Sequence, residues 1–271
     1  MSDEPARLPS LRPVVTARAS VELKEFVRDR QAFIFTFILP VLLLVIFGTV
    51  FNEEIAPGVT FSQYFLAGMI ASGLVYTGFQ NLAIAIPQER EDGSLKRLYG
   101  TPMPPAAYFA GKVVLVLVSL VAQVILLLLI GVLFFGVDLP TTAEKWFTFV
   151  WLLALGLLTC TLLGIAFSSV PRNGRSAPAL VSPVVLVLQF ISGVFIVFGR
   201  LPHWMQQVAS LFPLKWLCQG MRYVFLTRDF VSQEPAGAWE LGRVFLVLGI
   251  WAVIGVVLCT RTFRWQRRED R

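Results

Sequence analysis

The sequence predicts an all-α polytopic membrane protein with about six transmembrane helices. Of its 271 residues, 56% are hydrophobic and 15% are charged, and the mean hydropathy is +0.72, whereas about a quarter of the residues in a soluble domain are charged. Residues 109–136 form an almost uninterrupted apolar run, longer than the roughly 20 residues with which a helix crosses a hydrocarbon core. A water-soluble fold of this size would lack polar surface.

Apolar runs separated by charges and by Pro or Gly place all the expected spans in one transmembrane domain, residues 32–260. Residues 1–31 precede it, and residues 261–271 form a basic tail. The three cysteines are scattered without a CxxC pair, so neither a disulfide framework nor a zinc site is expected. The spans are expected at residues 32–51, 63–86, 109–136, 146–170, 179–198 and 239–260.

The distribution of Lys and Arg predicts that both termini lie in the cytoplasm. Basic residues are dense before the first span, in the loop 87–105 and in the tail, whereas residues 52–62 contain none. Cytoplasmic loops carry the excess of Lys and Arg in membrane proteins. The net charge of +6 is then explained by a surface that attracts anionic lipid headgroups, without a nucleic-acid partner.

Residues 16–30 are expected to form an amphipathic helix before the first span. Ala19, Leu23 and Phe26 recur at helical spacing and form its apolar side. Such a helix would lie along the inner membrane interface, and the alternative is a solvated extension of the first span. The polar face is expected to carry Arg18, Glu22, Glu25 and Asp29.

A re-entrant helical hairpin is expected on the outer side before the last span. Pro202 and Pro213 begin two apolar-leaning stretches, residues 203–212 and 214–226, and each is too short to cross a bilayer. Trp204 and Trp216 suit a membrane interface. The alternative is a folded outer cap, because a break at proline also suits a surface loop.

The expected spans hold few polar groups. Apart from Glu240 at the start of the last one, they contain no Asp, Glu or His, which disfavours an ion-driven transporter. Lys112 is expected to snorkel to the headgroups from the start of the third span. Four amides are expected to form hydrogen bonds between helices, with contact to a substrate path as the alternative: Gln80, Asn81, Gln123 and Gln189.

Enzymatic chemistry is not expected of this chain. The single histidine, His203, has no Asp, Cys or Ser arrangement near it of the kind that a hydrolase or metal site requires. The nearest match to a phosphate-binding loop, residues 106–113, fails at two of its four defining positions. We therefore expect that the chain binds neither a metal nor ATP itself.

The second cytoplasmic loop, residues 87–105, carries the most specific pattern. Leu95, Leu98 and Tyr99 give a short helix with an apolar face, and Asp92 or Ser94 can cap its N-terminus. A short exposed helix with charged flanks is suited to docking in a cleft on a cytoplasmic partner. The alternative is a plain connecting loop.

The same loop resembles that of a known family. The run Glu89-Arg90-Glu91-Asp92-Gly93-Ser94-Leu95, followed by Leu98 and Thr101-Pro102, is similar to the loop between the second and third spans of ABC-2 type transporter permeases. Residues 212–222 are similar to the stretch before the last span of that family. The resemblance covers nearly the whole chain and is greatest to compact bacterial drug and natural-product exporters, such as daunorubicin-resistance type permeases.

The resemblance implies a permease subunit of an ATP-driven exporter of a hydrophobic or amphipathic compound, in the bacterial plasma membrane. Its partners would be two ATP-binding subunits, which hold ATP and Mg²⁺, and a second permease copy in a homodimer or a heterodimer. Alternatives are an exporter of a lipid-linked glycan or another lipid, a stand-alone carrier or channel, and a membrane scaffold or enzyme. The coupling helix that contacts the ATP-binding subunit would comprise Glu89, Arg90, Glu91, Asp92, Gly93, Ser94, Leu95, Arg97, Leu98 and Tyr99.

Overall fold

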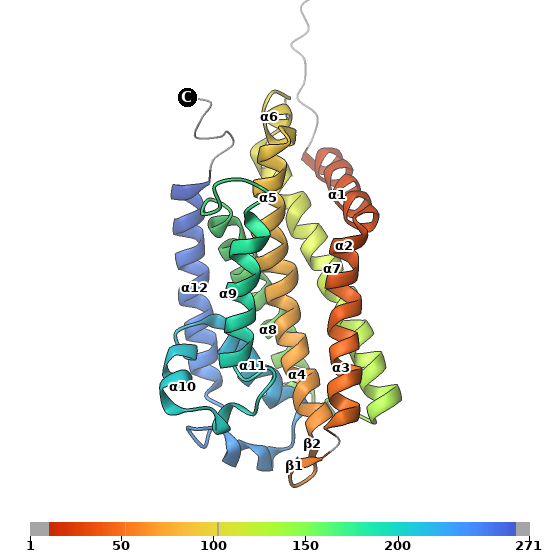
Figure 1. Cartoon of the computed structure of the whole chain (residues 1–271), viewed down its shortest axis with the longest axis vertical. Coiled ribbons are helices and arrows are strands. Elements are labelled where there is room, and N and C mark those ends of the chain that lie inside the picture. The colour runs from red at the N-terminus through yellow and green to blue at the C-terminus, as the bar shows by residue number, and fades with distance from the viewer. Residues whose placement is uncertain (1–10, 52, 102, 264–271) are drawn as a thin grey trace, which may run out of the picture.

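The computed structural model describes residues 11–51, 53–101 and 103–263, which form a helical bundle with one short strand hairpin (Figure 1). The first ten residues, Pro102 of the family-like motif and most of the expected basic tail lie outside the described residues. The prediction of an all-α polytopic membrane protein is confirmed. Five helical runs are long and apolar enough to cross a membrane: Arg30–Val50, Phe61–Glu91, Pro105–Phe135, Ala143–Phe167 and Leu241–Thr262.

The first two runs contain π-helical turns. The first run joins α2 (Arg30–Phe33), η1 (Ile34–Ile38) and α3 (Leu39–Val50), and α1 (Leu11–Arg28) precedes it. The strands β1 (Glu54–Ala56) and β2 (Val59–Thr60) pair antiparallel before the second run, which joins α4 (Phe61–Leu74), η2 (Val75–Gln80) and α5 (Asn81–Glu91). The remaining long helices are α7 (Pro105–Phe135), α8 (Ala143–Phe167) and α12 (Leu241–Thr262).

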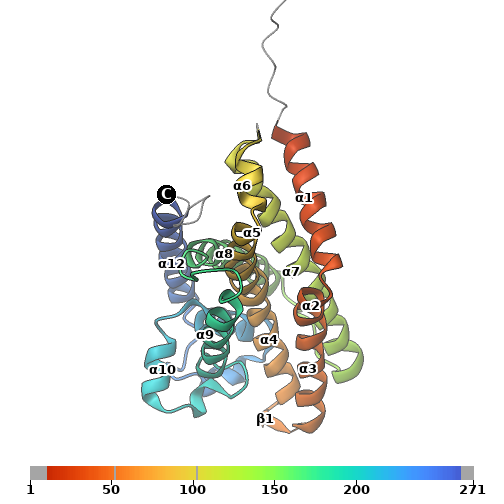
Figure 2. The same cartoon turned by 45° about the horizontal axis from the view of Figure 1, so that its top comes forward.

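The helices give the bundle two distinct ends. The short helix α6 (Ser94–Tyr99), the start of α1 and the end of α12 lie at one end, which we call the loop end (Figures 1 and 2). The strands β1 and β2 lie at the opposite end, which we call the strand end. The chain thus returns to the loop end with its last described helix.

The fifth expected span is shorter than predicted. The helix α9 (Ala177–Ile191) has 15 residues and is therefore about 22 Å long, less than the roughly 30 Å of a hydrocarbon core. It ends early because Gly193, at a φ of 78°, turns the chain. The Tyr64 hydroxyl then fixes the turn, since it donates to Gly193 O at 2.8 Å and accepts from the Phe198 N–H at 3.0 Å.

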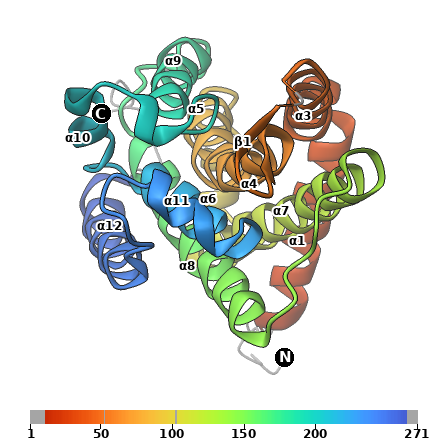
Figure 3. The ribbon, with the colours of Figure 1, turned by 90° about the horizontal axis from the view of Figure 1, so that it is seen from below.

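The predicted hairpin is present as α10 (His203–Ala209) and α11 (Pro213–Phe225), with short turns η3 (Phe198–Arg200) and η4 (Arg228–Gln233) on either side. The helix α11 packs against α4, α8 and α12 (Figure 3). Trp251 Nε1 donates to Leu211 O at the hairpin tip at 2.8 Å. Because Trp251 lies ten residues after Leu241, at which α12 begins, the tip reaches about 15 Å along α12.

Indole groups satisfy the non-helical backbone at that tip. Trp216 Nε1 donates to Ser210 O at 2.8 Å, beside the bond from Trp251 to Leu211. The expectation that Trp216 lies at a membrane interface is therefore wrong, because its side chain is buried to make this bond. Trp204 on α10 is 61% exposed.

Candidate functional site

The charged motif of the loop begins on the end of a long helix. The run from α4 to α5 has 31 residues and is about 46 Å long, longer than the roughly 30 Å of a hydrocarbon core. Glu89, Arg90 and Glu91 therefore form the last turn of α5, and the expected helix 89–99 is in fact two pieces. Gly93, at a φ of 78°, breaks the helix, and Asp92 Oδ1 accepts from the Ser94 N–H at 2.8 Å.

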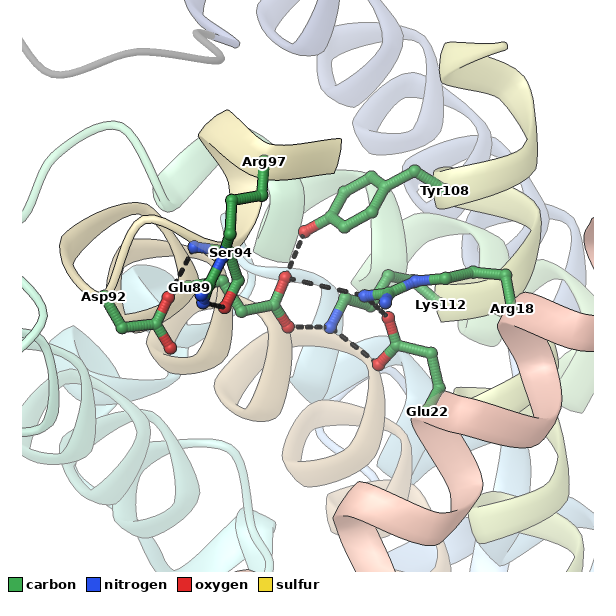
Figure 4. A network of polar contacts seen from close by, with 8 residues as sticks. All are labelled: Arg18, Glu22, Glu89, Asp92, Ser94, Arg97, Tyr108 and Lys112. Carbon is green, nitrogen blue, oxygen red and sulfur yellow. Dashed lines mark hydrogen bonds and ion pairs between the residues drawn. The ribbon is translucent and has the colours of Figure 1, made fainter. Parts of the chain in front are cut away.

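Glu89 is the centre of a polar network (Figure 4). Its carboxylate accepts from Lys112 Nζ and from the Tyr108 hydroxyl, the latter at 2.8 Å. Arg18 Nη2 lies 3.9 Å from Glu89 Oε2. The end of α5 is thereby bonded to α7 and ion-paired with α1, three elements that are distant in the sequence.

Lys112 connects this carboxylate to a second one. Its Nζ donates to Glu22 Oε2 at 2.8 Å, and Glu22 also pairs with Arg18. Lys112 is only 1% exposed, so the expectation that it snorkels to the headgroups is wrong. Two carboxylates within bonding distance stabilise its charge inside the protein, which removes the need to reach water.

The first helix packs on α7 rather than presenting all its charges to solvent. Ala19 and Glu22 are both buried, so Glu22 belongs to the packed face and not to the exposed polar face expected for it. Gly111 permits this contact, because a Cβ there would lie 2.7 Å from Arg18 Cγ. Glu25 is exposed, and Asp29 Oδ1 caps α2 by accepting from the Ala32 N–H at 3.0 Å.

The short helix α6 turns its apolar side inward. Leu95, the first residue of the expected apolar face, is completely buried and does not stand free for a partner. Lys96 and Arg97 are exposed and Leu98 is half-buried. Among the side chains of α6 that the structure describes, the exposed ones are therefore basic.

The end of α5 is also bound to the loop between α8 and α9. Arg90 Nη1 donates to Ser168 O at 3.2 Å, and Glu91 Oε2 accepts from the Arg175 N–H at 3.1 Å. Such bonds hold the last turn of α5 from two sides. A displacement of α6 would therefore be passed to α1, to α7 and to the α8–α9 loop.

A mainly apolar cavity of about 680 Å³ lies nearer the strand end, between α3 and α9. Gln189 lines it, and Gln189 Oε1 accepts from the Tyr76 hydroxyl at 3.2 Å. Phe47 and Phe195 line it with ring centroids 5.9 Å apart. Glu53 and Arg200 also line it, which gives the cavity an apolar body with charged groups beside it.

The other three amides that the sequence singled out do not line this cavity. Gln123 is buried over Gly73 of α4, where a Cβ would meet its amide oxygen at 2.9 Å. Gln80 and Asn81 are half-buried at the end of the π-helical turn η2. Among the four amides, Gln189 alone lines this cavity.

Sequence reasoning overlooked Tyr108 and the pairing of Lys112 with Glu22 and Glu89. The available signal was a lone lysine in an apolar run, since a charge that is buried in a membrane helix needs a partner. Glu22, four residues after Arg18 on the preceding helix, was a candidate for that role.

The bundle of long apolar helices defines a polytopic membrane protein. The ABC-2 type transporter family matches residues 15–226, and the chain belongs to this family as the membrane component of an ABC transporter. It is 23% identical to "Inner membrane transport permease YadH" of Escherichia coli over 90% of this chain and 93% of that protein. It is 27% identical to "Putative transport permease ycf38" of Porphyra purpurea over 83% of this chain and 80% of that protein.

Proposed function

We propose that the chain exports a hydrophobic or amphipathic compound across the bacterial plasma membrane, driven by ATP hydrolysis on separate subunits. The loop end faces the cytoplasm, and two ATP-binding subunits hold ATP and Mg²⁺ there. A second permease copy completes the complex. The names of the relatives, which describe transport permeases, support this proposal.

The network around Glu89 is the observation that carries the proposal. Glu89 joins the last turn of α5 to Lys112 of α7 and to Arg18 of α1, and α6 begins three residues after Glu91, without a long linker. A partner that moves α6 thus acts directly on the ends of three helices. Buried ion pairs resist separation, because breaking one leaves an uncompensated charge.

The cavity between α3 and α9 supports the substrate class. Its body is lined by leucine and phenylalanine side chains, including Leu43 and Phe47, and its polar contacts are few. Ligand pockets of this kind hold compounds through apolar contact and fix their orientation with a small number of polar groups. An amphipathic molecule would place its apolar part along α3 and its polar part near Gln189 or Arg200.

The test is reconstitution in vesicles with candidate ATP-binding subunits from the same genome. Glu89→Gln keeps the side-chain shape but removes the charge that pairs with Lys112. We expect this variant to bind the subunit normally, with ATP-driven transport reduced about tenfold, as expected for the loss of one hydrogen bond to a charged group. Glu25→Gln is the matched control, because Glu25 is an exposed carboxylate of α1, and it should transport as the wild type does.

Two results would oppose the proposal. Transport by the wild type that persists in vesicles without ATP would indicate a stand-alone carrier. Equal ATP-driven transport by Glu89→Gln and Glu25→Gln would remove the coupling role of the network. A charge reversal at Glu89 is a poorer test, because it would place a third cation beside Lys112 and Arg18 and disturb folding.

A further inference from the structure

A small cavity of about 260 Å³, with many polar residues in its lining, lies at the helical hairpin, apart from the apolar cavity between α3 and α9. It is bounded by α10, by the first turns of α11 and by residues 234–243. His203, Gln206 and Gln207 line it from α10, and Lys215 and Arg243 line it from the other walls. No function described above uses these side chains.

Lys215 is a buried cation without a paired carboxylate. It is 5% exposed, and its Nζ donates to Gln219 Oε1 at 2.5 Å and lies 3.5 Å from the centroid of the Trp216 ring. It forms no ion pair within the part of the chain that the structure describes. An amide and a ring face compensate a buried charge only in part, since buried charges are normally paired.

Two carboxylates, Glu234 and Glu240, also line the cavity, and each is paired with an arginine. Glu234 accepts two hydrogen bonds from the Arg222 guanidinium, at 2.5 Å and 3.2 Å. Glu240 forms an ion pair with Arg243 at the rim of the cavity. Arg222 Nη1 is buried and has no acceptor among the described residues. With Lys215 included, these five charged groups therefore carry one positive charge in excess, and one buried donor among them lacks an acceptor in the part of the chain that the structure describes.

Burial and the neighbouring Arg222 lower the pKa of Lys215 to about 8. The ammonium form nevertheless predominates at neutral pH, because the pKa remains above 7. An anion in the cavity would meet this charge directly.

The helix α10 is amphipathic, but its polar residues face the cavity and its apolar residues are exposed, the opposite of a surface helix in a soluble protein. Its polar residues Gln206 and Gln207 line the cavity, whereas its Trp204 and Val208, and Leu211 two residues after its end, are exposed. The hairpin tip reaches about half the length of α12, at Trp251. The exposed apolar side of α10 therefore lies at a depth that suits acyl chains.

We propose that this cavity binds the phosphate oxyanion of a membrane lipid, with Lys215 as the principal cation and the amides of Gln206 and Gln207 at its walls. The acyl chains lie along Trp204, Val208 and Leu211, outside the cavity. A volume of about 260 Å³ holds a phosphate group together with a few water molecules. A phosphate supplies several strong acceptors and the negative charge that Lys215 lacks as a partner.

The experiment measures thermal unfolding of the purified full chain in a neutral detergent. Three probes are titrated separately: short-chain phosphatidylglycerol, a diacylglycerol with the same chains and free glycerol phosphate. The variants are Lys215→Gln, the charge-conserving Lys215→Arg and the control Arg228→Gln. Arg228 is an exposed cation in η4, outside the cavity, so its loss changes the net charge equally.

We expect phosphatidylglycerol to raise the unfolding temperature of the wild type saturably, whereas the diacylglycerol does not. Lys215→Gln should weaken the apparent affinity about tenfold, the effect of one hydrogen bond to a charged group. Lys215→Arg and Arg228→Gln should bind as the wild type does. If Lys215→Gln does not fold, Arg243→Gln at the exposed rim should still weaken binding.

The probes distinguish the sources of the oxyanion. If glycerol phosphate raises the unfolding temperature as much as the lipid does, in a manner that requires Lys215, that result supports the site and assigns it to a free phosphate ester. Equal protection by the diacylglycerol would overturn the proposal, because that probe has no phosphate. Equal weakening in Arg228→Gln would also overturn it, since it would indicate attraction to net charge alone.

Discussion

Lys112 Nζ of α7 lies 2.8 Å from Glu22 Oε2 of α1, and the same ammonium group contacts Glu89 at the end of α5. One buried cation thus holds two carboxylates from helices that are far apart in the sequence. We predict that Lys112→Met lowers the free energy of unfolding by about 3 kcal/mol, because removal of one partner leaves buried charges uncompensated. Unfolding in a detergent series measures this difference.

The control for this variant is Lys24→Met. Lys24 is an exposed lysine of α1, and an exposed ion pair contributes about 0–1 kcal/mol. Similar losses in the two variants would show that the pairing of Lys112 contributes little.

Two positions on α6 should separate folding from partner binding. Arg97 is exposed, so Arg97→Glu should leave unfolding unchanged and prevent capture of the ATP-binding subunit by reversing a surface charge. Leu95 is completely buried, so Leu95→Ala should cost about 2–5 kcal/mol of stability. Co-purification and thermal unfolding measure the two effects, and normal capture by Arg97→Glu would exclude this surface from the contact.

Two glycines should respond oppositely to a side chain. A Cβ at Gly111 would lie 2.7 Å from Arg18 Cγ, so Gly111→Val should separate α1 from α7 and cost about 1–3 kcal/mol. Gly249 in α12 has no atom within 4 Å of an added Cβ, and Gly249→Ala should stabilise the helix by about 0.5–1 kcal/mol. Thermal unfolding of both variants measures the contrast, and equal stability would show that α1 adjusts without cost.

The long apolar runs allowed the spans to be predicted, because the cost of exposing the backbone to lipid makes a helix of sufficient length the only solution. Their ends were less predictable. The second span continues to Glu91 because Glu89 is stabilised by Lys112, 23 residues away. The helix α9, at the place of the fifth expected span, stops at Ile191 because the Tyr64 hydroxyl forms a hydrogen bond with the turn after it. Both causes are long-range contacts, and a local hydrophobic pattern does not contain them.

The loop motif located the candidate site, but the faces of its helices could not be read from spacing alone. Leu95 and Leu98 share an apolar face that could pack either against a partner or against the rest of the permease. Leu95 is buried within the permease. Likewise, Glu22 matched a polar face by its residue type, yet Lys112 makes burial of that carboxylate favourable. The missing information was the position of α7 beside α1.

The Tyr64 hydroxyl should account for the order of the segment after α9. Tyr64→Phe removes the acceptor of the Phe198 N–H and the donor to Gly193 O. The free energy of unfolding should fall by about 1–3 kcal/mol, because buried polar groups lose their partners. Tyr223→Phe is the control, since its hydroxyl bonds Glu144 at an exposed position. Equal stability of the two variants would show that the backbone finds other partners.

Lys215 should make stability depend on pH in the alkaline range. Burial and Arg222 lower its pKa to about 8, and the charges of Glu234, Glu240 and Arg243 also act on it. The unfolded chain retains the ordinary lysine pKa, about 10.4, so between pH 8 and 10 the unfolded state binds more protons than the folded one. Stability relative to Lys215→Met should therefore rise with pH across this window, because deprotonation relieves the buried charge.

The measurement is the difference in unfolding temperature between the wild type and Lys215→Met from pH 7 to pH 10, in detergent without anionic lipid. The difference should be constant below pH 8, where both states are protonated, and should move in favour of the wild type above it. Arg228→Gln, which removes an exposed cation, should show no such trend. A flat difference through pH 10 would mean that Lys215 keeps its ordinary pKa and that the cavity compensates its charge without a bound anion.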